Sequence, residues 1–192
     1  MEFIFLEFLD SEINALIHGL RHEFMGDAQN TNVHITVRGP YYEKIEANLI
    51  ESFERQLGAE PILIHSAGMF RNKEYVVYIK IESLNLKRIW WKPDYPIESY
   101  GFNPHITIYK GSNKSIAECA YEFLRSENIK LLCHAYKLTS YVSKQYELFP
   151  DEFSPRAGNF LGLSNRRLIK PDILQRAANV VRQCNKGSAG NS

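Results

Sequence analysis

The chain has 192 residues, of which 44% are hydrophobic and 23% are charged, and its formal net charge is +1. This length and composition predict one globular domain with a substantial core and a C-terminal appendage. A net charge so close to zero argues against a protein that coats long duplex nucleic acid and against a polybasic membrane anchor, because both need a strong positive field. No apolar run of the sequence reaches the length of a membrane-spanning helix.

The chain begins with a predicted strand and an amphipathic helix. Residues 2–8 are apolar with two glutamates, which favours a first strand over a signal peptide. Asp10 and Ser11 then supply helix-capping side chains ahead of an apolar stripe with helical spacing: Ile13, Leu16, Ile17, Leu20 and Phe24. His18 and His22 have a spacing that can bind a metal, but they lie opposite this stripe, which favours a solvated face.

Residues 32–38 predict a second strand that carries the first of two matching motifs, His34-Ile-Thr36-Val. Residues i and i+2 of a strand lie on the same face, so His34 and Thr36 share one face and the branched apolar residues share the other. The same period places Arg38 beside them. Its guanidinium could meet a phosphate there, or Arg38 could be an ordinary surface arginine.

A second helix and a hairpin follow. Residues 42–57 have helical apolar spacing and are stopped by Gly58. Residues 61–70 and 75–82 predict two strands joined by a tight turn. His65 has no threonine two residues later, so it is interpreted as structural.

Residues 84–101 predict an irregular connection in which Trp90 and Trp91 are interleaved with basic residues. This composition suits a nucleotide, since bases stack on aromatic rings and phosphates pair with cations. A lid that covers the core, or a dimer contact, would have the same composition.

The second motif, His105-Ile-Thr107-Ile, lies in the predicted strand 103–109, ahead of Tyr109. Two histidines that face each other can divide acid–base work, one taking a proton from the attacking oxygen and the other giving one to the leaving oxygen. The threonine hydroxyls would donate hydrogen bonds to the non-bridging phosphate oxygens. This chemistry needs no metal and no cofactor.

The remaining chain predicts a helix over 115–126, one or two strands over 129–142, and a last helix from Lys170 to Cys184. The three cysteines are Cys119, Cys133 and Cys184, an odd number without CxxC spacing. They predict reduced, buried thiols in a cytoplasmic protein.

At the two motifs the chain resembles the 2H phosphoesterase superfamily, which is named for two His-φ-Ser/Thr-φ motifs. The segment 104–108 is especially similar to that family's second motif, and 138–148, where Ser140 precedes a tyrosine, is similar to the family's strand after its third helix. The resemblance covers residues 1–150. It implies a bilobal α+β fold of two pseudo-symmetric antiparallel lobes, with helices outside and the motifs across a central cleft.

The resemblance also implies roles. His34 and His105 become base and acid, in an order that the family does not fix, and Thr36 and Thr107 become the phosphate holders. Residues 151–186 would form a C-terminal extension with its own helix, and 187–192 a disordered tail.

The expected function is metal-independent cleavage of a nucleotide phosphodiester, in a 2′,3′-cyclic phosphate, an RNA end, or a 2′–5′-linked or cyclic oligonucleotide. The candidate substrate contacts are Arg38, Tyr109, Trp90, Trp91 and Tyr146. The protein is expected to be a monomer. The alternatives are a catalytically inactive nucleotide- or RNA-binding module with the same fold, and a metalloprotein that uses His18 and His22.

Overall fold

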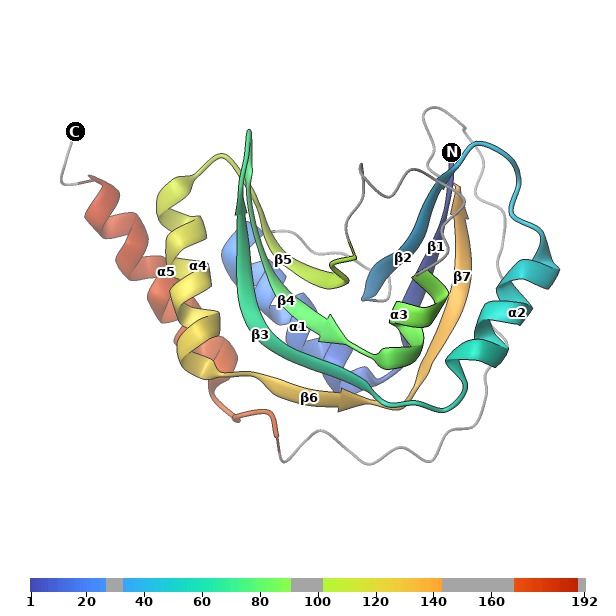
Figure 1. Ribbon diagram of the computed structural model, residues 1–192. Helices are drawn as coiled ribbons and strands as arrows, with labels where there is room; N and C mark the ends of the chain where they lie inside the picture. Colours follow the sequence, from blue (N-terminus) through green and yellow to red (C-terminus); the bar gives the residue numbers. More distant parts are fainter. Residues whose placement is uncertain (27–32, 91–101, 143–167, 190–192) are drawn as a thin grey trace.

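The computed structural model describes residues 1–26, 33–90, 102–142 and 168–189, which form two antiparallel sheets and five helices (Figure 1). The first sheet has the order β2 (His34–Tyr41), β1 (Glu2–Phe8), β7 (Tyr136–Val142). The second has the order β5 (His105–Gly111), β4 (Tyr75–Glu82), β3 (Ile62–Arg71), β6 (Lys130–Cys133). The helices are α1 (Ser11–Met25), α2 (Ala47–Leu57), α3 (Leu84–Trp90), α4 (Lys114–Glu127) and α5 (Ile173–Ala189). The predicted α+β class is therefore confirmed.

The first sheet buries one face of its central strand β1. Ile4, Leu6 and Phe8 are fully buried, as the period of two requires. Leu6 pairs with Ile35 of β2 on one side and with Leu138 of β7 on the other, which gives a buried row across the sheet. Helix α2 lies outside this sheet and packs against β7 (Figure 1).

The second sheet also buries one face, on which an aliphatic row runs from β4 into β5. Ile79 pairs with Ile106, and both are buried. Helices α1 and α4 cover this face, and the ring centroids of Phe24 and Phe123 lie 5.7 Å apart between them. Helix α1 follows β1 in the chain but packs against β5, so the core is continuous through both sheets.

Helix α1 forms as predicted. Asp10 caps its first turn by accepting hydrogen bonds from the amides of Glu12 and Ile13, at 2.9 and 3.1 Å. The predicted apolar stripe is buried, and Gly26 ends the helix in the left-handed conformation. None of the helices in the described ranges is both long and apolar enough to cross a bilayer.

The prediction of an irregular connection from residue 84 is wrong for its first part, because α3 occupies Leu84–Trp90. The carboxylate of Glu60 accepts hydrogen bonds from the amides of Leu84 and Asn85, at 3.1 and 2.8 Å, and so caps the first turn. Helix α2 begins at Ala47, five residues after the predicted start at 42. The chain before it is held by the amide of Ile45, which donates to the Glu2 carboxylate at 2.8 Å.

Helix α5 packs on the outer surfaces of α1 and α4 (Figure 1). The contact is close at Gly19 of α1, where an added Cβ would lie 2.5 Å from a methyl carbon of Leu174. The helix continues to Ala189, three residues into the predicted disordered tail, because one glycine at position 187 costs a helix only about 1 kcal/mol.

The prediction of three reduced thiols is wrong, because Cys119 of α4 and Cys184 of α5 form a disulfide. The two cysteines lie 65 residues apart in the chain, so their spacing in the sequence could not predict that they pair. Cys133 is a buried free thiol, and burial raises its pKa to about 12. The cysteines therefore no longer support the predicted cytoplasmic location.

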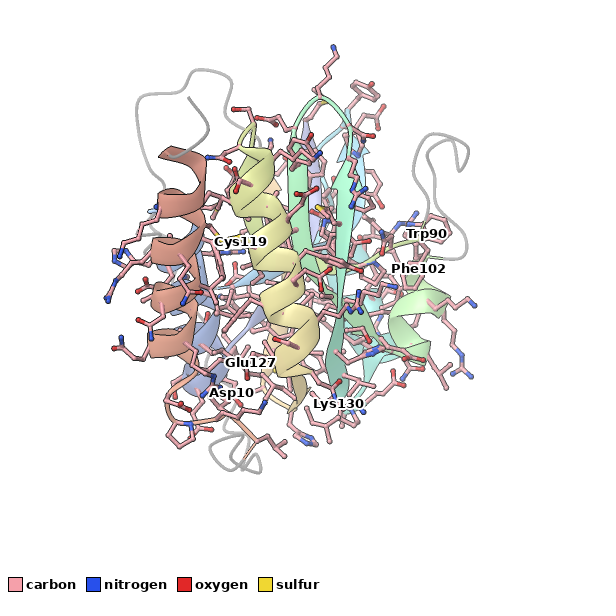
Figure 2. All side chains as sticks on the ribbon, turned by 90° about the vertical axis from the view of Figure 1, so that its left-hand side faces the viewer. Asp10, Trp90, Phe102, Cys119, Glu127 and Lys130 are labelled. Carbon is pink, nitrogen blue, oxygen red and sulfur yellow. A yellow bond between two sulfur atoms is a disulfide. The ribbon has the colours of Figure 1, made fainter. Side chains whose placement is uncertain are left out.

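Glu127 joins α4 to α5 through a buried carboxylate. It accepts hydrogen bonds from Arg176 Nε and Nη2, both at 2.8 Å, and from Lys170 Nζ at 3.0 Å. Figure 2 shows Cys119 and Glu127 at different levels of α4, so α5 is fastened at two places along its length. The hydrogen bonds from the Arg176 guanidinium, together with Lys170, hold the pKa of Glu127 below its ordinary value of 4.5.

We expect Glu127→Gln to lower the free energy of unfolding by about 1–3 kcal/mol at neutral pH, because the substitution weakens charge-assisted hydrogen bonds. Since the pKa of Glu127 is lowered in the folded state, the wild-type advantage is complete above pH 4.5 and is lost as the pH falls through the lower folded value. Urea unfolding at a series of pH values measures this. Glu122→Gln, at a 63% exposed side chain of the same helix, is the control. A difference that does not change with pH would contradict the prediction.

Candidate functional site

The two motif strands meet where the two sheets approach each other. Strand β2 is the edge strand of the first sheet, β5 is the edge strand of the second, and the two strands are in contact. Helix α1 holds β5 in place, since Arg21 Nε donates a hydrogen bond to the carbonyl oxygen of Thr107 at 2.8 Å. The fold thus brings together two segments that lie far apart in the sequence.

Each histidine shares a face with its threonine, as predicted. On β2, His34 pairs with Glu7 and Thr36 pairs with Phe5, on the face opposite the buried Leu6. In Figure 1, α2 lies outside the first sheet, and α4 and α5 lie outside the second. The faces without these helices are therefore turned toward each other, and we call them the inner faces.

The same arrangement holds on β5. His105 pairs with Lys80 and Thr107 pairs with Tyr78, again on the face opposite the buried Ile79 and Ile106. Both histidines are half-buried. A half-buried side chain combines a fixed position with access from outside, which suits a group that must touch a substrate.

Both motif strands carry a single extra residue directly after the threonine. In β2 the pairing passes from Thr36–Phe5 to Arg38–Ile4, so Val37 has no opposite residue. In β5 it passes from Thr107–Tyr78 to Tyr109–Val77, so Ile108 has none. Such a β-bulge breaks the alternation of faces. The residue two positions after each threonine therefore points into the core instead of onto the inner face.

The prediction that Arg38 lies beside His34 and Thr36 is wrong for this reason. Arg38 is 5% exposed, and its guanidinium carbon lies 4.9 Å from the ring centroid of Phe53 in α2 and 5.7 Å from that of Tyr41. This is the geometry of a cation–π contact in the core beneath α2. It offers no guanidinium to a phosphate on the inner face.

Tyr109 is turned inward in the same way and is 6% exposed. Its hydroxyl donates a hydrogen bond to the carbonyl of Asn113 at 3.1 Å and accepts one from the amide of Asn113 at 3.2 Å. Burial raises the pKa of Tyr109 above its ordinary value. Its predicted role as a substrate contact is therefore replaced by a role in holding the turn between β5 and α4.

Aromatic rings flank both histidines. The His34 ring stacks on Phe5, with centroids 4.4 Å apart, and Phe5 stacks in turn on Tyr141 at 4.9 Å. The His105 ring packs against Tyr78 at 4.7 Å and against the edge of Phe70 at 5.4 Å. The sequence does not predict these four aromatic residues, because only the folded structure shows that Phe5, Phe70 and Tyr78 lie against the histidines and that Tyr141 lies against Phe5.

One nitrogen of His105 has a defined proton. Its Nδ1 lies 2.7 Å from the carbonyl oxygen of Asn103. A carbonyl oxygen can only accept, so Nδ1 carries the hydrogen in this contact. In the neutral ring Nε2 then has the lone pair, which makes it the atom that can take up or return a proton.

Two further polar residues of the inner face were not predicted as site residues. Lys80 is exposed and is the direct cross-strand neighbour of both His105 and His65. The sequence predicts a structural role for His65. Its ring is held by Glu82, with Nε2 3.1 Å from the carboxylate, and by Ser66, with Nδ1 2.9 Å from the hydroxyl. The alternation of strand 75–82 indicates a polar face that includes Lys80, but not which histidines lie beside it.

The remaining candidates are placed differently. Trp90 ends α3 and packs against Phe102, with ring centroids 5.4 Å apart (Figure 2). Trp91 and Tyr146 lie outside the described residues. In the parts of the chain that the structure describes, no group of three or more His, Cys, Asp or Glu side chains could hold a metal ion, and His18 and His22 belong to no such group.

A cavity of about 530 Å³ lies elsewhere, between the first half of α1 and the start of α5. Its lining is largely apolar and includes Leu16, Ile173 and Leu174. Neither motif contributes to it. The chemistry of the motifs, and not this cavity, therefore identifies the candidate site.

No protein-family model matches this chain, and no curated protein is significantly similar to it in sequence.

We expect Arg38→Met to lower the free energy of unfolding by about 2 kcal/mol, because it removes a desolvated cation from the rings of Phe53 and Tyr41. Thermal or urea unfolding measures this loss. Arg71→Met, at the exposed end of β3, is the matched control and should change stability little. Equal stability of the two variants would show that Arg38 is not held by these rings.

Proposed function

We propose that this chain is a metal-independent phosphodiesterase of the 2H phosphoesterase type, acting on a nucleotide substrate, with His34 and His105 as its acid–base pair. One observation carries the proposal. The two His-x-Thr motifs lie on contacting edge strands, each on an inner face and each followed by the same one-residue bulge. Core packing alone does not require this repetition of polar residues and irregularity.

The proposed reaction is a proton relay across the phosphate. One imidazole takes the proton of the attacking oxygen, that oxygen bonds to phosphorus, and the bond from phosphorus to the leaving oxygen breaks. The second imidazole gives its proton to that leaving oxygen. His105 suits either role, because its Nδ1–H is fixed on Asn103 and Nε2 remains for the transfer.

Thr36 and Thr107 would hold the non-bridging oxygens. Their side chains lie on the same faces as the two histidines, and Thr36 is exposed. Hydrogen bonds from preorganised donors to these oxygens are stronger when negative charge builds up on them, which lowers the barrier. This scheme assigns no step to a metal or a cofactor.

The arrangement of the sheets also supports a 2H phosphoesterase-like fold. In each sheet the motif strand is an edge strand whose neighbour runs antiparallel and contributes aromatic residues to the inner face, Phe5 in β1 and Tyr78 in β4. This correspondence is what two pseudo-symmetric lobes would produce.

A second candidate is a nucleotide- or RNA-binding module that lacks catalysis. The aromatic rings on both inner faces favour it, since bases stack on such rings whether or not a bond is cleaved. The intact pair of histidines and threonines favours the enzyme over this module.

We expect His34→Ala and His105→Ala each to lower kcat/KM by about 10²–10⁴-fold, because each removes one partner of the proton relay. The assay is chromatography of 2′,3′-cyclic nucleotides, 2′–5′ oligoadenylate and cyclic di- and trinucleotides after incubation with the protein. His22→Ala, at an exposed position of α1, is the control and should keep full activity. Full activity of both site variants would overturn the proposal, and binding without turnover by the wild type would favour the binding module.

We expect a bell-shaped dependence of kcat/KM on pH, because one imidazole must be neutral and the other protonated at the start of the reaction. His105→Ala should remove one limb of the bell from its residual activity. Activity should be unchanged by EDTA. A monotonic profile in the wild type, or loss of activity in EDTA, would contradict the two-histidine scheme.

A further inference from the structure

One residue from each strand of the second sheet forms a row that starts at His105. The register pairs His105 of β5 with Lys80 of β4, Lys80 with His65 of β3, and His65 with Lys130 of β6. Directly opposed residues in a sheet project from the same face. All four side chains therefore lie on the inner face that carries Thr107, and we call them the basic row.

The basic row leads away from the candidate site. Adjacent strands lie about 4.8 Å apart, so the three steps from His105 to Lys130 span roughly 14 Å. Both lysines are exposed. The carboxylate of Glu82, a side chain that is 67% exposed, contacts the row at 3.1 Å from His65 Nε2. Glu82 and His65 are paired with each other. Lys80 and Lys130 therefore supply most of the positive charge of the row that is available to a bound anion.

Aromatic residues accompany the row at its catalytic end. The rings of Phe70 and Tyr78 lie 4.5 Å apart, and both contact the ring of His105. Cations in single file beside aromatic rings are the usual surface for single-stranded nucleic acid, whose phosphates pair with the cations while the bases stack. A net charge of +1 argues against the strong overall positive field that binding to a long duplex needs, whereas a short strand needs only a few cations such as those of the row.

We propose that the basic row binds phosphates beyond the scissile one, so that the substrate is a single-stranded oligonucleotide and not a mononucleotide. This inference rests on the proposed function of His34 and His105. It narrows the substrates considered above: an oligonucleotide, linear or cyclic, gains contacts with Lys80 and Lys130, whereas a 2′,3′-cyclic mononucleotide has no second phosphate to reach Lys130.

Binding to a short fluorescent oligoadenylate tests the proposal without any turnover, in the His34→Ala/His105→Ala protein. Lys80→Ala and Lys130→Ala should each reduce the slope of log Kd against log salt concentration by about 0.7, and each should weaken binding roughly fourfold near 0.15 M salt. Lys80→Arg should restore the slope. Lys114→Ala, on α4 at the opposite face of the sheet, is the matched control and should change neither quantity. AMP, with one phosphate, should bind equally to the parent protein and to its Lys130→Ala variant.

The outcomes separate this inference from the proposed function. Unchanged affinity and salt slope in both lysine variants would overturn the basic row, and turnover by the wild type would then leave the phosphodiesterase proposal intact. Lysine effects on binding, together with no turnover by the wild type over the substrate panel, would support the basic row and count against catalysis.

Discussion

The extra residue after each motif threonine is the constraint on which the candidate site depends. Val37 and Ile108 are the bulge residues that have no opposite residue in the neighbouring strand. If both strands paired without these bulges, the strict alternation of faces would put Arg38 and Tyr109 on the inner faces, beside the histidines. With these bulges, the histidine and the threonine of each motif lie on the inner face, the isoleucine between them is buried in the core, and the long side chain of Arg38 or Tyr109 anchors the strand there. The same short segment thus positions the histidine and the threonine and anchors the strand in the core. The bulge makes this possible because it turns the next long side chain to the other face without interrupting the strand.

The candidate site also depends on the path of α1 from the first sheet to the second. This helix leaves the first sheet and packs on the second, where Phe24 meets Phe123 and Arg21 reaches the backbone of β5. The sheet that holds His34 is thereby fixed against the sheet that holds His105 through one continuous core. Helix α5 adds a third layer, and it is joined to α4 by a disulfide and by the carboxylate of Glu127. A proton relay between two sheets needs such rigidity, since transfer depends on fixed distances.

The periodicity of the sequence predicts those elements correctly whose structure depends on residues close together in the chain. The stripe of α1, its Asp10 cap, and the alternation of β1 and β4 all follow from neighbours within a few residues. The misses have long-range causes. Helix α3 is capped by Glu60, which lies more than twenty residues upstream, and Cys119 meets Cys184 only after α5 has docked. At the site, His34, Thr36, His105 and Thr107 could be selected from their repetition, but the bulges, the aromatic neighbours and Lys80 depend on register, which one sequence does not display.

The hydrogen bond of Arg21 has a consequence for how this chain meets copies of itself. Strand β5 ends its sheet, and an exposed sheet edge is a template for adding a foreign strand. Here α1 occupies that edge, because Arg21 takes the carbonyl of Thr107 and the sulfur of Met25 accepts from the amide of Lys110 at 3.3 Å. A second chain would have to displace the helix before it could pair with β5. Helix α1 thus blocks the pairing of a foreign strand with β5 at Thr107 and Lys110.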